Sequence, residues 1–185
     1  GDLAGFVHIY DSKTTKILHK IHFKDNIKSI EFSSILQIIT ICCEESIYFL
    51  RPIFLEKRVK NDIIHSNIIP NIESKNFDSN KIYKWKTYDK NSIQKNGLLF
   101  SIHWNEGALI NFQWHHKGDF FSTLSKSSLG QTQLLIHNLS SLEFFSPLSK
   151  NKGNITCFSF HPSKPHFYVC THSNIMIYDL KQQEL

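Results

Sequence analysis

Short runs of apolar residues that alternate with polar ones recur along this 185-residue chain at a spacing of about 40 positions. The residue that closes each third run marks the spacing: Tyr10 to Phe49 is 39 residues, and His137 to Tyr178 is 41. The interval from Phe49 to His137 is 88 residues, which is one repeat plus an insertion. Repeats of this length with four short strands each are typical of propeller blades. The sequence therefore predicts an all-β chain, a partial WD40-type β-propeller of about three to four four-stranded blades with one long inserted loop.

The boundaries of the expected strands follow from turn residues between the alternating runs. Strands are expected at 2–11, 16–21, 26–32, 36–43, 46–50, 98–103, 108–114, 120–124, 133–138, 142–145, 155–160, 167–171 and 175–179. The run at 36–43 is nearly all apolar, as expected of a strand covered on both faces. The run at 98–103 is predicted to be the outer strand of the interrupted blade. A further short strand is expected at 82–85, because Trp85 favours a packed position.

Three regions follow from this pattern. Residues 1–51 are predicted to form a partial blade plus most of a second one, and 97–185 one and a half to two further blades, truncated at the end. Residues 52–96 read as a basic, Asn/Lys-rich inserted surface loop. Because closed propellers need at least about four blades, we expect a propeller truncated on both sides.

Positive charge is concentrated in the insertion. Residues 51–96 contain 10 Lys/Arg and 5 Asp/Glu, and the rest of the chain contains 11 of each, so the net charge of +5 arises here. Basic residues interleaved with aromatic ones suit phosphate contact and base stacking. The alternative, which the absence of an RNA-reading motif favours, is a solvated loop of biased composition. The candidate RNA-contact residues are Arg58, Lys60, Lys84, Trp85 and Lys86.

Motifs that would indicate catalysis, a cofactor or a metal are missing from the sequence. It contains no Gly-x-Ser-x-Gly, Gly-x-Gly-x-x-Gly, Gly-x-x-x-x-Gly-Lys or His-Glu-x-x-His motif, so we expect neither an enzyme nor a cofactor. Cys157, Cys170 and His172 lack zinc-ligand spacing, and the histidines at 115, 116 and 161 are interpreted as structural turn residues. No apolar run is long enough to span a membrane.

The cysteine usage points to a reducing compartment. Four cysteines in 185 residues are too few for a disulfide framework. Cys42 and Cys43 are adjacent on one expected strand, so their side chains should point to opposite faces. We predict reduced and mostly buried thiols.

Particular short sequence motifs within the repeats carry more information about the family than the repeat length does. They include Leu135-Ile136-His137 and Gln183-Glu184-Leu185, which a generic blade lacks. The matching segments are 114–123, 133–139, 160–165 and 177–185. They closely resemble the C-terminal propeller of the block-of-proliferation (Erb) family of ribosome-biogenesis WD-repeat proteins. The resemblance covers 97–185 well and 1–50 moderately, whereas 53–80 has no match.

That resemblance implies a non-catalytic scaffold in the nucleolus and nucleoplasm, acting in maturation of large-subunit rRNA within the pre-60S particle. The implied partners are a pescadillo-type protein and a second WD-repeat protein, with rRNA as a further candidate. Two alternatives of other classes stay open: a generic WD40 protein-interaction module in another complex, and a protein that binds RNA directly through the basic insertion.

A truncated propeller would expose apolar faces and sheet edges that neighbouring blades normally cover. We therefore predict that these 185 residues, expressed alone, aggregate or unfold. Size-exclusion chromatography combined with a thermal melt checks this, and a monomer that melts cooperatively would contradict it.

Overall fold

Every regular element that the computed structural model describes is a β-strand. The described residues are 5–52, 83–88, 97–148 and 154–181. None of them belongs to a helix that could cross a membrane. The chain divides into two compact units: unit 1 comprises 1–32 and 37–105, and unit 2 comprises 33–36 and 106–185.

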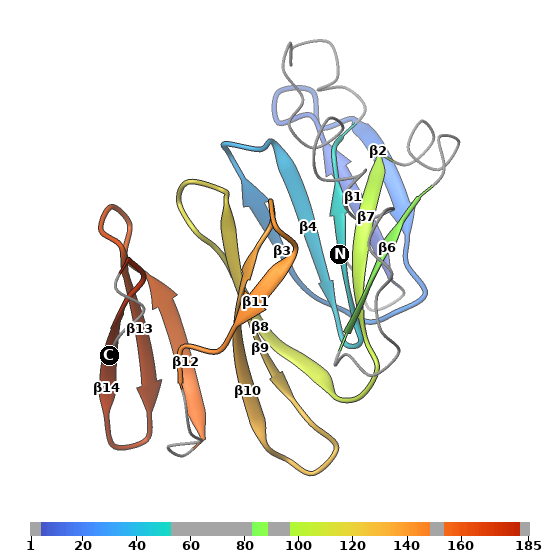
Figure 1. Cartoon of the computed structure of the whole chain (residues 1–185). Coiled ribbons are helices and arrows are strands. Elements are labelled where there is room, and N and C mark those ends of the chain that lie inside the picture. The colour runs from blue at the N-terminus through green and yellow to red at the C-terminus, as the bar shows by residue number, and fades with distance from the viewer. Residues whose placement is uncertain (1–4, 53–82, 89–96, 149–153, 182–185) are drawn as a thin grey trace. The chain divides into compact units, whose positions relative to one another are not determined.

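Unit 1 is built on a two-stranded and a five-stranded antiparallel sheet (Figure 1). The smaller sheet pairs β1 (Phe6–Tyr10) with β2 (Ile17–His22). The larger sheet has the order β3 (Ile27–Ser33), β4 (Ile38–Cys43), β5 (Ser46–Leu50), β7 (Leu98–Trp104) and β6 (Tyr83–Thr87). Strand β4 begins two residues later than predicted, because Gln37 adopts a positive φ of 52° in the preceding turn.

The insertion contributes one strand to the larger sheet, as the sequence predicts. Strand β6 pairs antiparallel with β7, and Trp85 lies opposite Ile102. The prediction that β7 is the outer strand was wrong, since β6 covers its free edge. The reason lies in side-chain burial: Tyr83 and Trp85 alternate with polar residues, so that β6 can bury two large rings while its other face remains exposed.

The residues on either side of the insertion meet at one point. The backbone N–H of Arg51, directly after β5, donates to the carbonyl oxygen of Gly97, directly before β7, at 2.8 Å. Gly97 has a φ of +69°, and a Cβ there would collide with the carbonyl oxygen of Arg51, so the contact requires glycine. Because the entropy of loop closure rises only slowly with length, closing the two ends lets the sheet tolerate a long insertion.

One apolar cluster of unit 1 is shared by its two sheets. Val7, Ile21 and Phe23 from the smaller sheet and its exit cluster with Ile41 and Cys43 of β4, and with Leu50 and Leu98. Cys43 belongs to this cluster and the preceding Cys42 does not, which places the two thiols on opposite faces as predicted. Both faces of β4 are almost fully buried, as expected from its apolar run.

Unit 2 contains two consecutive meanders (Figure 1). The first is a four-stranded sheet in the order β11 (Glu143–Phe145), β10 (Thr132–Asn138), β9 (Phe120–Lys126) and β8 (Ala108–Trp114). The second has three strands, β12 (Ile155–Phe160), β13 (His166–Thr171) and β14 (Ile175–Asp179). This is the sequential antiparallel order of propeller blades, as predicted.

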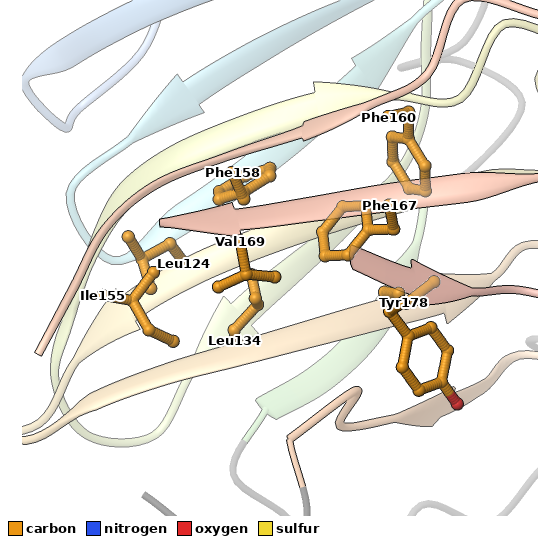
Figure 2. Close-up of a cluster of buried hydrophobic side chains, with 9 residues drawn as sticks. Leu124, Leu134, Ile155, Phe158, Phe160, Phe167, Val169 and Tyr178 are labelled. Atoms are coloured by element: carbon orange, nitrogen blue, oxygen red, sulfur yellow. The ribbon is translucent and has the colours of Figure 1, made fainter. Parts of the chain in front are cut away.

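The two sheets of unit 2 pack face to face through a single apolar cluster. Figure 2 shows Leu124 and Leu134 of the four-stranded sheet facing Ile155 and Val169 of the three-stranded sheet. The full cluster comprises Leu124, Leu134, Ile136, Ile155, Phe158, Phe160, Phe167, Val169 and Tyr178. Burying such side chains stabilises each by roughly 1.5–3 kcal/mol relative to exposure, so this contact contributes substantially to the stability of unit 2.

Two polar links fix the register of the same contact. The side-chain oxygen of Gln113 on β8 accepts a hydrogen bond from the backbone N–H of Phe160 on β12 at 3.0 Å, and its side-chain nitrogen donates to Ser159 Oγ at 3.3 Å. Thr132 Oγ1 on β10 accepts from the backbone N–H of Ile155 at 3.3 Å. Both links satisfy backbone donors of β12, whose outer edge would otherwise be unpaired in this sheet.

His137 occupies the position of the blade tryptophan and is fully buried. Its ring stacks on Phe121 with centroids 4.6 Å apart, and Nε2 lies 2.8 Å from Thr123 Oγ1. Burial lowers the pKa of His137 to about 3, so the imidazole is neutral in the folded protein at physiological pH.

This burial predicts that acid destabilises the blade through His137. The folded pKa lies below the unfolded value of about 6.5, so the stabilisation is complete above that pH. It is lost at about 1.4 kcal/mol per pH unit as the pH falls from there towards 3. In the full-length protein, the double variant Thr123→Val/His137→Phe removes the titration without leaving the hydroxyl unpaired. Urea unfolding at pH 7 and pH 5 should show a smaller acid loss for the variant, and an equal loss would contradict the prediction.

Candidate interaction surfaces

The two candidate RNA-contact lysines that the structure describes lie together on β6. Lys84 is opposite His103 and Lys86 is opposite Ser101, so these four side chains share one face, here called the basic face. Both lysines are exposed. Arg58 and Lys60, the other basic candidates, lie outside the described residues.

Trp85, the aromatic candidate, points to the opposite face of the sheet. It is only 6% exposed, and its ring lies 5.8 Å from Phe100 and 6.4 Å from Tyr83. The structure therefore brings Lys84 and Lys86 together and separates Trp85 from them. Trp85 anchors the strand that presents the two lysines, and its buried ring offers no open face for a base to stack on.

A chain of polar contacts supports the basic face. The Lys86 ammonium lies 5.6 Å from the ring centre of Tyr88, and the Tyr88 hydroxyl is 3.0 Å from Ser101 Oγ. Ser101 Oγ is in turn 2.8 Å from His103 Nε2. Burial, together with the nearby charge of Lys86, lowers the pKa of His103, so its imidazole is neutral at pH 7. The two lysines are thus the charged groups of this face.

The basic face permits two interpretations. Ammonium groups on an ordered strand can contact phosphate oxygens. Strand β6 is also the edge of its sheet, and exposed lysine on an edge strand discourages pairing with another chain. Both roles require that Lys84 and Lys86 remain exposed.

A second candidate surface is a cleft of about 620 Å³ in unit 2. Its apolar lining includes the half-buried rings of Phe120, Phe144 and Phe145, together with Leu180. Lysines and carboxylates also line it, among them Lys117 and Glu143. The volume falls in the range of ligand and side-chain pockets, roughly 300–1,000 Å³. No sequence pattern indicates this cleft, because it arises where strand β11 and turns of two successive blades meet.

The turn histidines beside this cleft have structural surroundings. Nδ1 of His161 accepts hydrogen bonds from the backbone N–H groups of Ser163 and Lys164 at 3.0 and 2.9 Å, which closes the turn. His115 is 8% exposed and packs edge-on against Phe160 with centroids 5.1 Å apart. Among the residues with described positions, no three His, Cys, Asp or Glu side chains gather as metal ligands.

The prediction of mostly buried cysteines was only half right. Cys42 and Cys43 are buried, but Cys157 is exposed and Cys170 is partly exposed. Both belong to alternating strands, and they occupy the face turned away from the apolar cluster of Figure 2. Alternation alone does not show which face of a blade is covered.

Comparison with solved structures defines the class of protein. The chain superimposes on the β-propeller domain of Cps50 (Swd1) from Myceliophteria thermophila with a TM-score of 0.60, over 96% of this chain and 48% of that one. At 14% sequence identity this likeness concerns the fold alone. Together with the antiparallel meanders, it makes the chain part of a WD40-type β-propeller.

Comparison with curated sequences gives the family. The chain is 32% identical to ribosome biogenesis protein ERB1 of Meyerozyma guilliermondii over 87% of its length, and 27% identical to the BOP1 homolog of Dictyostelium discoideum over 97%. No protein-family model matches it. The chain belongs to the ERB1/BOP1 family of ribosome biogenesis proteins, as its resemblance indicates. It spans 23% and 22% of the length of these two relatives.

The opposed roles of the two faces of β6 can be tested by hydrogen exchange. Trp85→Ala removes the buried ring, a type of change that costs about 3–5 kcal/mol, so the amides of 83–87 should lose their protection. The matched variant Lys84→Ala/Lys86→Ala changes only exposed side chains and should retain it. Equal protection in both variants would show that Trp85 does not anchor the strand.

Proposed function

We propose that this protein is a non-catalytic scaffold in biogenesis of the large ribosomal subunit, and that its propeller supplies protein contacts within the pre-60S particle. The observation that carries the proposal is its similarity to ERB1 and BOP1 ribosome biogenesis proteins over most of the chain. Nothing in the described residues or in the relatives' names indicates an enzymatic activity. The proposed partners are a pescadillo-type protein and a second WD-repeat protein, and the proposed location is the nucleolus and nucleoplasm.

The physical basis of a scaffold is a rigid surface. Blades held by a shared apolar cluster and by side-chain to backbone links present their turns in fixed positions. The cleft of unit 2 lies among such turns, and its half-buried phenylalanines can receive an apolar side chain of a protein partner. We therefore place a candidate protein-docking point there.

Affinity purification of the tagged full-length protein tests both statements. The wild type should co-purify with large-subunit precursor rRNA and with a pescadillo-type protein. Phe144→Asp introduces a charge into the cleft lining and should weaken recovery of a protein partner at least tenfold. Leu129→Asp is the matched control, because Leu129 is 85% exposed in a turn and its variant should behave as wild type. Failure of the wild type to recover precursor particles would remove the proposed function.

The basic face favours direct RNA contact as a second candidate function. Lys84 and Lys86 are exposed side by side within the segment that carries the net charge of the chain. A contact of this kind is sequence-independent and weakens with salt, because each neutralised phosphate releases counterions. Protein partners would position the scaffold, and the two lysines would add affinity for rRNA.

Salt dependence of RNA binding distinguishes this contact from a solvated edge strand. In the full-length protein, Lys84→Ala/Lys86→Ala should reduce the slope of log affinity against log salt by about 1.4, the value for two phosphate contacts to a single strand. Lys117→Ala/Lys181→Ala removes the same charge from the cleft of unit 2 and is the control. An unchanged slope in the first variant would assign Lys84 and Lys86 to edge protection alone.

A further inference from the structure

Two cysteines of unit 2 face each other across an antiparallel pair. Cys157 on β12 lies directly opposite Cys170 on β13, next to an irregularity in the register between Ile155 and Cys157. Directly opposed residues have their Cα atoms about 4.5–5.5 Å apart and their side chains on one face. A disulfide requires Cα atoms about 4.4–6.8 Å apart, a range that includes the usual separation of directly opposed residues.

The two thiols also interact and are accessible. Cys157 is exposed and Cys170 is partly exposed. A hydrogen bond between the Cys170 and Cys157 thiols raises the pKa of Cys170, and burial raises it further. Cys170 is therefore the harder thiol to deprotonate, and Cys157 is the more exposed of the two, so we take Cys157 as the first nucleophile.

The remaining two cysteines differ from this pair in both accessibility and pKa. Cys42 and Cys43 are buried, and burial raises the pKa of each thiol to about 12. A thiol with such a pKa holds almost no thiolate at neutral pH, and solvent does not reach it. Among the four cysteines, all of which lie in the described part of the chain, only Cys157 and Cys170 form a pair that is both accessible and directly opposed.

We propose that Cys157 and Cys170 form a reversible dithiol–disulfide pair whose oxidant is a low-molecular-weight disulfide of the glutathione type. The Cys157 thiolate attacks one sulfur of glutathione disulfide, and a glutathione thiolate leaves. The Cys170 thiol loses its proton and attacks Cys157 Sγ, which releases the second glutathione thiolate. The protein loses two electrons and two protons, and glutathione disulfide becomes two molecules of glutathione.

The disulfide would act as a covalent staple within one blade. It would join β12 to β13 on the face opposite the apolar cluster, where Cys170 is paired with Ile175 of β14. Ile175 is 73% exposed, so the staple would lie beside an apolar surface of the three-stranded sheet. Oxidation would therefore stiffen that surface without repacking the cluster of Figure 2.

The test is mass spectrometry of the reduced full-length protein after incubation with glutathione disulfide, alkylation under native conditions, and trypsin digestion. One tryptic peptide, 153–181, holds both cysteines, because Lys164 precedes Pro165 and resists cleavage. We expect this peptide to lose two hydrogens and to carry no alkyl label. The one peptide that holds both Cys42 and Cys43 should remain reduced and should be alkylated only after unfolding.

Single variants separate the two chemical steps. Cys170→Ser should accumulate a glutathione mixed disulfide on Cys157, because the resolving thiol is absent. Cys157→Ser should slow oxidation of the remaining thiol at least tenfold. A wild-type peptide that is alkylated twice after treatment, or that carries glutathione on both cysteines, would overturn the proposal. Circular dichroism of each variant establishes that it retains the strand content of the wild type.

Discussion

Each blade in this protein has two faces, and a sheet with apolar residues on both of them is stable only when another layer covers each one. In unit 2 one contact covers one face of each sheet, where the four-stranded and three-stranded sheets share the cluster around Leu134, Phe167 and Val169. The side chain of Gln113 and the hydroxyl of Thr132 then satisfy backbone donors of β12. The positions of the turns, and hence of the cleft that they line, follow from this packing.

The sequence predicts the fold well because its information is local. A period of two identifies strands, turn residues bound them, and the spacing of repeats identifies blades. The same local signals could not show that β6 would cover the edge of β7. Pairing between strands that are distant in the sequence depends on where their aromatic side chains can be buried, and this is a property of the folded chain. Trp85 indicated that a strand forms there, but not which face it would bury.

The candidate surfaces likewise include features that the sequence indicates and features that only the folded structure shows. Composition drew attention to Lys84, Trp85 and Lys86 as one group, whereas alternation along β6 places the tryptophan on the opposite face from the lysines. The cleft and the Cys157–Cys170 pair arise only from tertiary and cross-strand neighbours, so no sequence motif predicts them. Family membership was indicated by particular sequence motifs in the repeats, and the alternation of apolar and polar residues alone would not have indicated it.

The central claim is that the two sheets of unit 2 are successive blades that stabilise each other through one apolar contact. A double-mutant cycle on Leu134→Ala and Val169→Ala measures this directly, because the two residues come from different sheets and meet in the cluster (Figure 2). Residues in contact typically show an interaction energy of about 0.5–3 kcal/mol, and we expect a value in that range for the free energy of unfolding. Additivity of the two losses within about 0.3 kcal/mol would contradict the claim.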